Sequence, residues 1–362
     1  MNATGAPQVG HHHFLDALRG LASLWVVFNH TEQYLPNSLD RIPAAIREPL
    51  IMHGNGGVPV FFVLSGFVIA HSLRHTVMDG PGFGNFMTRR LVRLSPPYYA
   101  AVVFALVVNF VSTVAKSETF DPPSVLEAIA HVLYLPDLLN MPMVNGVHWT
   151  LYVEVQFYLL YGLLLWGLAR VPDRSWHRHW IALTVLAAAS LVPPLFALRE
   201  GRENWFGPYV HAFVFGVLIQ WTRSKRLPPV VLGAFTAGLG FAWALHQDRV
   251  AGAGFVAGLI VLATTGPRGA RGLLEQGPFQ FLGRISFSLY LVHSPVMGAV
   301  SWLGGKVLGV SMAAELATMA AAIVASIVVS AVFYRLFEQP ALEWSRRLRR
   351  RTPATGDVAV AT

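Results

Sequence analysis

The chain has 362 residues, of which 54% are hydrophobic and only 13% are charged. Soluble domains carry about 25% charged residues, so this composition excludes an ordinary soluble protein and predicts an all-α, polytopic membrane protein. The absence of cysteine excludes disulfides, thiolate nucleophiles and cysteine-based metal sites. The net charge of +8 does not indicate a nucleic-acid partner, because the basic residues lie in short loops between apolar segments, as in cytoplasmic membrane loops.

Residues 1–13 are polar and lack a basic region followed by a cleavage site, so we expect a flexible N-terminus and a retained first span. The apolar segments that follow predict about ten transmembrane helices. They cover residues 14–34, 57–74, 95–115, 149–169, 180–198, 205–222, 228–246, 251–266, 285–304 and 315–337. The loops on one side carry most of the arginine and lysine, which places both termini in the cytoplasm. We expect a membrane domain over 14–340 and a basic, disordered cytoplasmic tail over 341–362.

Two segments need separate interpretation. Residues 125–139 are apolar but too short to cross a bilayer, and we interpret them as an interfacial or re-entrant helix on the outer face. The run Ser95-Pro96-Pro97 resembles a helix start, with a capping serine and two prolines in the first turn. It therefore predicts that the third span begins there.

The first span carries two ionisable side chains, Arg19 and His30. Eleven residues at about 100° per residue place both on one face of the helix, about 16 Å apart along its axis. Ionisable groups inside a membrane are costly and indicate function. A cation near one end and a titratable base near the other favour a long anionic ligand that lies along the helix.

The fourth predicted span begins near the outer face and carries Glu154 and Gln156 close to its start. Counting the helical rise from the span ends places Glu154 and His30 at nearly the same depth. A carboxylate beside an imidazole raises its basicity and fixes its tautomer. We therefore expect Glu154 to orient His30.

Arg90 and Arg93 lie three residues apart before the third predicted span, so on a helix they share a face. Two guanidiniums at a cytoplasmic membrane boundary suit phosphate recognition. A positive-inside anchor is the equally weighted alternative.

The remaining polar residues favour structural roles. We expect His293 to bond a neighbouring helix and Asp16 to pair with Arg19. Glu338 either orients an arginine or is a solvated helix end. The run His11-His12-His13 lacks further ligands in sequence, so we interpret it as a flexible patch and expect no metal site.

Several motifs occur in a fixed order along the chain. They are LDALRGLASLWVVFNH at 15–30, GGVPVFFVLSGFVIAHSL at 56–73, RRLVRLSPPYY at 89–99, WTLYVEVQFYLL at 149–160, LGRISFSLYLVHSP at 282–295 and YRLFEQP at 334–340. In these motifs the chain resembles the acyltransferase-3 family of membrane O-acyltransferases. It departs from the family pattern at Thr150, where serine is usual, and at Val155, where a second glutamate is frequent.

The resemblance implies transfer of an acyl group, usually acetyl, from cytoplasmic acetyl-CoA or another acyl-CoA to a hydroxyl, commonly on a carbohydrate. It implies that Arg19, Arg90 and Arg93 serve donor binding and that His30 serves transfer, as a general base or as a transient acyl carrier. Supporting positions in the matching motifs are Trp149, Gln156 and Tyr290.

The expected acceptor is an exopolysaccharide, a lipopolysaccharide or another envelope glycan at a bacterial-type inner membrane. A small hydroxylated metabolite such as a macrolide is the second choice. A transporter or flippase of a lipid-linked glycan is the alternative from another class. The spans show no clear internal repeat of the kind many transporters have, and a transporter would not consume acetyl-CoA.

Overall fold

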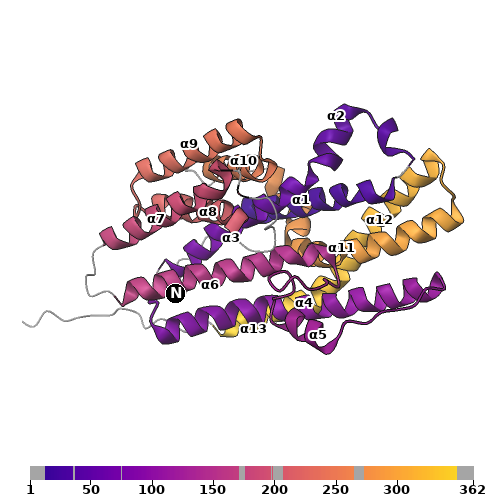
Figure 1. The fold of residues 1–362 in the computed structure, drawn as a ribbon, viewed down its shortest axis with the longest axis horizontal. Coiled ribbons are helices and arrows are strands. Elements are labelled where there is room, and N and C mark those ends of the chain that lie inside the picture. The colour runs from indigo at the N-terminus through magenta and orange to yellow at the C-terminus, as the bar shows by residue number, and fades with distance from the viewer. Residues whose placement is uncertain are drawn as a thin grey trace, which may run out of the picture.

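The computed structural model describes residues 13–348 apart from 36, 75, 171–175, 197, 199–206 and 265–272. Within these ranges all regular structure is helical, which confirms the predicted all-α class (Figure 1). The expected flexible N-terminus up to residue 12 and the chain from residue 349 onward lie outside the described residues.

Each predicted span overlaps one helix. In chain order these helices are α1 (His13–His30), α3 (Gly57–Leu73), α4 (Gly80–Ala115), α6 (Trp149–Ala169), α7 (Trp176–Leu195), α8 (Val210–Arg223), α9 (Pro229–His246), α10 (Arg249–Thr264), α11 (Gly277–Val307) and α12 (Met312–Phe333). The chain also forms three shorter helices: α2 (Ala44–Arg47), α5 (Val125–Val132) and α13 (Gln339–Arg347).

Five helical runs of the described chain are long and apolar enough to cross a membrane, by length and composition. They are Ala44–Leu73, Gly80–Ala115, Gly146–Ala169, Pro229–His246 and Met312–Arg347. Two shorter apolar helices cover His179–Leu195 and Arg249–Thr264. These runs agree with a membrane protein.

Helix α4 begins 15 residues before the predicted start of the third span. Asp79 caps it, since its side chain accepts a hydrogen bond from the Gly82 backbone N–H at 2.7 Å. The prediction of a helix start at Ser95 was therefore wrong, and Pro96 and Pro97 lie inside the helix. An aspartate cap followed by Gly-Pro supplies the stronger local start signal. As a result, Arg90 and Arg93 lie within one long helix rather than ahead of it.

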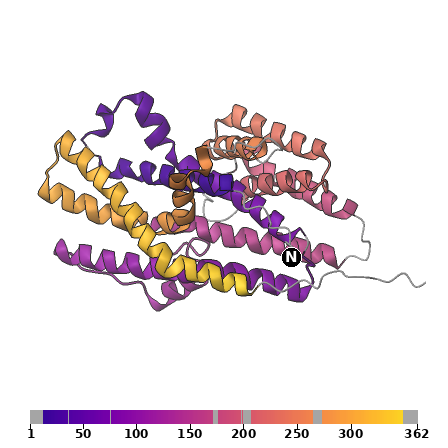
Figure 2. The same cartoon turned by 180° about the vertical axis from the view of Figure 1, so that it is seen from behind.

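The chain after residue 340 also differs from the expectation. Residues up to 347 form α13, which packs against α4 and is the yellow end of the rod that begins with α12 (Figure 2). The Ser345 hydroxyl donates to the Arg89 carbonyl at 2.8 Å, and the Arg89 Nε donates to the Ser345 carbonyl at 3.3 Å. These bonds stabilise a segment whose composition alone favours disorder, and they fix the N-terminal half of α4.

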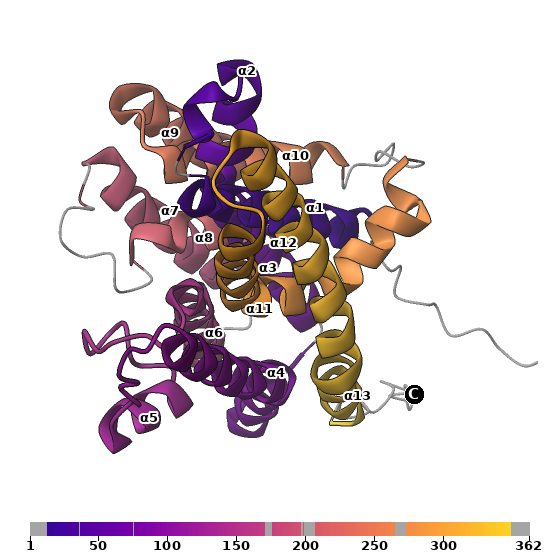
Figure 3. The same cartoon turned by 90° about the vertical axis from the view of Figure 1, so that its right-hand side faces the viewer.

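Helix α1 packs against α3 and α11, and α3 packs against α8, which places α1 and α3 in the centre of the bundle (Figure 3). Glycines permit both close crossings. A Cβ at Gly20 would lie 2.6 Å from the Gly283 nitrogen of α11, and a Cβ at Gly66 would overlap the Phe213 carbonyl of α8. Backbone contact of this kind fixes the register of each helix pair.

The segment predicted to be interfacial or re-entrant contains α5, which has only eight residues and is too short to cross a bilayer. A capping box begins it: the Ser124 hydroxyl accepts from the Glu127 N–H, and the Glu127 carboxylate accepts from the Ser124 N–H. Leu126 and Ile129 remain largely exposed, as an interfacial helix requires.

Candidate active site

A wide cavity of about 540 Å³ lies between α1, α3, α4, α11 and α13. Its lining is strongly basic, with six arginines and two carboxylates. The arginines are Arg19, Arg89, Arg90, Arg93, Arg284 and Arg346, and the carboxylates belong to Asp16 and Glu338. Guanidiniums at this density suit a ligand that carries several phosphates or carboxylates.

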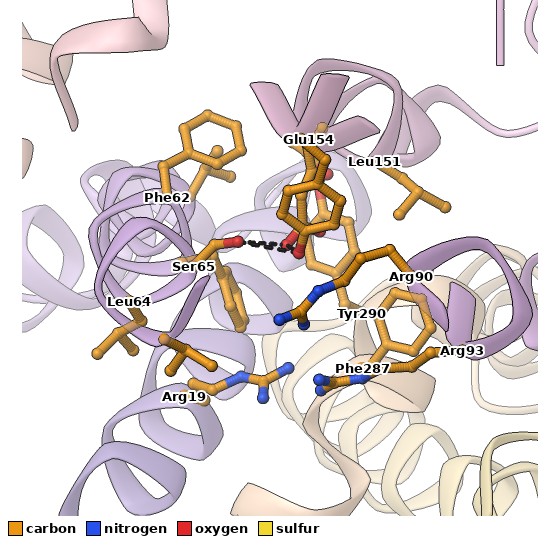
Figure 4. Close-up of a pocket in the computed structure, with 15 residues that line it drawn as sticks. Arg19, Phe62, Leu64, Ser65, Arg90, Arg93, Leu151, Glu154, Phe287 and Tyr290 are labelled. Carbon is orange, nitrogen blue, oxygen red and sulfur yellow. Dashed lines mark hydrogen bonds between the residues drawn. The ribbon is translucent and has the colours of Figure 1, made fainter. Parts of the chain in front are cut away.

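A narrow cavity of about 70 Å³ continues from the wide one, because Arg19, Val68, Arg90 and Arg93 line both. In Figure 4 the three guanidiniums of Arg19, Arg90 and Arg93 point into the same space. Beyond them the lining is mostly apolar and aromatic, from Val58, Phe61, Phe62, Leu64, Leu151 and Phe287. The combined space can accept a ligand with a charged head and a slender arm.

Arg90 and Arg93 face the same space, as their spacing on α4 predicted. Arg90 donates from Nη2 to the Ser72 hydroxyl at 2.9 Å. Its guanidinium also lies over the rings of Phe86 and Tyr158, at 5.8 and 5.5 Å from their centroids. These contacts direct the Arg90 side chain toward the cavity and away from bulk solvent.

Glu154 lines the narrow cavity, and in Figure 4 it lies on the opposite side of Arg90 from Arg19 and Arg93. Its carboxylate accepts hydrogen bonds from the Ser65 hydroxyl at 2.6 Å and from the Tyr158 hydroxyl. Those bonds and its charge place Glu154 with Arg90, and His30 lines neither cavity. The structure therefore gives no hydrogen bond between Glu154 and His30, and it does not test the expected role of Glu154 in transfer. The rise along a helix gives the depth of a residue in the membrane, but it does not say which helix lies beside that residue. Helix α6, which carries Glu154, packs against α3 and α4.

The ring that lies next to His30 belongs to His293 on α11. The two ring centroids are 4.9 Å apart with the planes at 76°. His30 Nδ1 lies 2.9 Å from the Val26 carbonyl, and His293 Nδ1 lies 2.9 Å from the Tyr290 carbonyl. A carbonyl only accepts, so Nδ1 carries the proton in both rings and Nε2 of the neutral ring keeps its lone pair. His293 Nε2 is buried and has no hydrogen-bond partner among the described residues.

Tyr290 connects the narrow cavity to this histidine pair. Its hydroxyl accepts from the Thr150 hydroxyl at 2.8 Å and donates to the Val147 carbonyl at 2.9 Å, and its ring lies 5.9 Å from that of His293. Thr150 therefore keeps a hydroxyl function at the position where the sequence departs from the family pattern.

The other predicted residues occupy separate places. Asp16 and Glu338 line the wide cavity, and Glu338 accepts from the Ser288 N–H at 3.1 Å and from its hydroxyl at 2.6 Å. Trp149 packs against Tyr209, with ring centroids 4.9 Å apart, and it lines neither cavity. Gln156 also lines neither cavity.

Serines in the apolar motifs were not singled out from the sequence. Ser65 and Ser72 bind Glu154 and Arg90, and Ser288 binds Glu338. A small hydroxyl in an otherwise apolar run was the available signal, but serine is common in membrane helices. The sequence signal was too weak to select these three.

The described residues contain no group of three or more histidines, cysteines, aspartates or glutamates that could hold a metal ion. His13 Nδ1 donates to the Gln280 Oε1 at 3.2 Å. His11 and His12 lie outside the described residues.

These features define a helical protein with helices long and apolar enough to cross a membrane and with a cavity lined by six arginines. A family model described as an acyltransferase domain matches residues 12–335. The chain therefore belongs to the acyltransferase-3 family.

Curated relatives agree with this assignment. The chain is 29% identical over 379 residues to acyltransferase MdmB of Streptomyces mycarofaciens, which covers 94% of this chain and 93% of that protein. It is 27% identical over 319 residues to the exopolysaccharide production protein ExoZ of Rhizobium meliloti, covering 82% and 92%. It is 28% identical over 207 residues to the regulator of hypoxia-inducible factor 1 of Caenorhabditis elegans, where it spans only 40% of the relative's length. No solved structure matches the chain.

Proposed function

We propose that this protein is an integral-membrane O-acyltransferase that moves an acyl group, acetyl first, from cytoplasmic acyl-CoA to a carbohydrate hydroxyl. One observation carries the proposal. A basic cavity meets, at Arg19, Arg90 and Arg93, a narrow cavity with a mostly apolar lining, and one residue of that lining, Tyr290, lies 5.9 Å from the ring of His293, the neighbour of His30. This shape matches a donor with a polyanionic head and a thin arm that ends in a thioester.

The topology of the proposal is ten membrane spans with both termini in the cytoplasm, in a bacterial inner membrane. The bias of basic residues toward one set of loops supports this orientation. The wide cavity then opens toward the cytoplasm, where acyl-CoA is available, and His30 lies toward the outer end of α1. Donor and acceptor would thus approach from opposite sides.

The chemistry assigned to His30 uses Nε2. With Nδ1–H bonded to the Val26 carbonyl, Nε2 takes the proton of the acceptor hydroxyl as its oxygen attacks the thioester carbonyl. The C–S bond then breaks and the proton passes to the departing thiolate. In the acyl-carrier alternative, the same nitrogen binds the acyl group before its transfer. Trapping of labelled protein after an acid quench distinguishes the acyl carrier from the general base. Burial of the arm excludes water and suppresses hydrolysis of the thioester.

Glu154 has a different task from the one that depth counting suggests. Its negative charge lies beside Arg90, and its bonds to Ser65 and Tyr158 hold α3 and α6 together. We assign it to the ordering of Arg90 and not to the orientation of His30.

A glycan is the preferred acceptor, because a relative of which the chain covers 92% is named for exopolysaccharide production. The test is to incubate the purified protein in lipid with labelled acetyl-CoA and a panel of envelope glycans and hydroxylated metabolites, followed by mass spectrometry. Label on an acceptor hydroxyl, with one CoA released per group, supports the proposal. Movement of a glycan across the membrane without donor consumption would identify a transporter instead.

A further inference from the structure

Among the described residues, four hydroxyl groups line the narrow cavity, and they differ in what accepts their protons. They belong to Ser65, Thr150, Tyr158 and Tyr290. Ser65 and Tyr158 both donate to the Glu154 carboxylate. Thr150 and Tyr290 instead donate to neutral oxygens, a hydroxyl and a backbone carbonyl. Since a charged acceptor binds a donor more strongly than a neutral one, an oxyanion in the cavity attracts the protons of Thr150 and Tyr290 first.

The hydroxyls of Thr150 and Tyr290 have two compatible hydrogen-bond arrangements. In the first, Thr150 donates to Tyr290 at 2.8 Å, and Tyr290 donates to the Val147 carbonyl at 2.9 Å. The Thr150 hydroxyl also lies 3.4 Å from the same carbonyl. Each hydroxyl carries one proton, so Thr150 can donate to Val147 when Tyr290 turns its own proton toward a ligand. The carbonyl keeps a donor in both arrangements, which makes the change inexpensive in free energy.

The ring of Tyr290 is held in place beside the histidine pair. Only 7% of the residue is exposed, and its ring centroid lies 5.7 Å from that of Phe61 and 5.9 Å from that of His293. His293 is the neighbour of His30, the proposed base. Tyr290 therefore lines the narrow cavity (Figure 4) and also lies one turn of α11 from the ring that contacts His30.

We propose that the Tyr290 hydroxyl stabilises the oxyanion that forms on the thioester carbonyl, and that Thr150 is a positioning residue that takes over its bond to Val147. This inference rests on the proposed function and adds a catalytic residue to it. As the acceptor oxygen bonds to the carbonyl carbon, the π electrons of the C=O bond move to the carbonyl oxygen. Tyr290 donates a hydrogen bond to that oxygen and keeps its proton. The acceptor proton passes to His30 Nε2, and from there to the thiolate that leaves when the C–S bond breaks.

Position 150 offers a matched pair of variants. Thr150→Ser keeps the hydroxyl, whereas Thr150→Val keeps the shape of the side chain and removes the hydroxyl. Tyr161→Phe is the control for the loss of a buried tyrosine hydroxyl. Tyr161 is also buried, its hydroxyl accepts from the Trp221 Nε1 at 3.0 Å, and it lines neither cavity.

The first experiment needs no acceptor. Acetyl-CoA labelled with ¹³C at the thioester carbonyl is bound to the purified protein in lipid, and the C=O stretch is measured by infrared difference spectroscopy. A hydrogen bond to the carbonyl oxygen lowers the stretching frequency. We therefore expect a lower frequency in the wild-type protein than in Tyr290→Phe. Thr150→Ser and Tyr161→Phe should keep the wild-type band, and Thr150→Val should shift it part of the way.

The second experiment measures kcat and KM for acetyl-CoA, with the acceptor that the labelled panel identifies. Tyr290→Phe should lower kcat about 10²- to 10³-fold, the usual effect of removing one oxyanion donor. KM should change less than about threefold, because the hydrogen bond strengthens only as charge develops on the oxygen. Thr150→Val should lower kcat by a smaller factor, and Thr150→Ser should restore it.

The outcomes separate the inference from the proposed function. An unshifted carbonyl band or an unchanged kcat in Tyr290→Phe overturns the inference, since a fall in kcat without a band shift shows a packing role. If Tyr290→Phe does not fold, the pair at position 150 decides, and equal bands and equal kcat in Thr150→Val and Thr150→Ser overturn it. Absence of transfer by the wild-type protein overturns the proposed function, whereas the band of bound acetyl-CoA still reports the contact with Tyr290.

Discussion

Replacement of His30 by alanine is expected to lower turnover about 10²- to 10⁴-fold, the usual contribution of a general base in the transition state. The imidazole is half-buried at the end of α1 beside His293, and its Nε2 is the nitrogen that its own hydrogen bond leaves available. Both open roles, base and acyl carrier, need that nitrogen. The loss should therefore appear in kcat whichever role is correct.

The cost in stability should be far smaller. The described hydrogen bond of His30 goes to Val26 of its own helix, and such a bond contributes about 1 kcal/mol net. Alanine recovers several tenths of a kcal/mol through its higher helix propensity. The variant should therefore insert, purify and melt nearly as the wild-type protein does, which separates a loss of chemistry from a loss of fold.

The assay measures initial rates of acetyl transfer at saturating acetyl-CoA, with thermal melting of the same preparations. His246→Ala is the matched control, because His246 also bonds a backbone carbonyl, that of Leu195 at 2.8 Å, and lines neither cavity. It should keep wild-type turnover. If His30→Ala retains more than about a tenth of wild-type turnover, His30 is not the base or the carrier, and His293 becomes the residue to test.

Three further changes test other parts of the structure. Glu154→Gln should change KM for acetyl-CoA and leave the pH dependence of kcat unaltered, since the carboxylate lies beside Arg90; a displaced pH profile would contradict this placement. Gly66→Ala should destabilise the protein by about 3 kcal/mol or more, because its methyl group would overlap the Phe213 carbonyl, and a melt that matches the wild type would refute the close crossing. Burial lowers the pKa of His131 below its usual 6.5, so its stabilising contribution is present above pH 6.5 and is lost as the pH falls through the lowered pKa. The melting temperature should therefore drop on acidification more in the wild type than in a His131→Gln variant.

Features that lie within one helix could be predicted from the sequence. The 3.6-residue period predicted that Arg90 and Arg93 share a face of their helix, and both side chains line the same cavity. The length of each apolar segment predicted where the helices lie along the chain. The start of α4 was misjudged because a proline pair inside the helix resembled a start more than the Asp79 cap did.

Contacts between helices could not be predicted in the same way. Hydropathy and rise fix how deep a residue lies, but they do not say which helix lies beside it. Depth counting therefore suggested a contact between Glu154 and His30, whereas Glu154 binds Ser65 and the neighbour of His30 is His293. The sequence also did not predict the packing of α13. This basic, weakly apolar helix is stabilised by the hydrogen bonds between Ser345 and Arg89 of α4 and not by its own composition.

The close crossing of α1 and α11 explains how the two ends of the site stay in register. Gly20 and Gly283 bring the backbones together beside Arg19, and from there both helices run in the same direction toward His30 and His293. Each helix covers ten residues between these points, or about 15 Å, so the contact of Gly20 with Gly283 also determines which rings meet ten residues further along. The separation of Arg19 and His30 is set within one helix and the pairing of His30 with His293 by one crossing. Under the proposed function, this fixed geometry sets the distance between the arginines that bind the donor and the base that attacks with it, so a donor arm of one length suits the site.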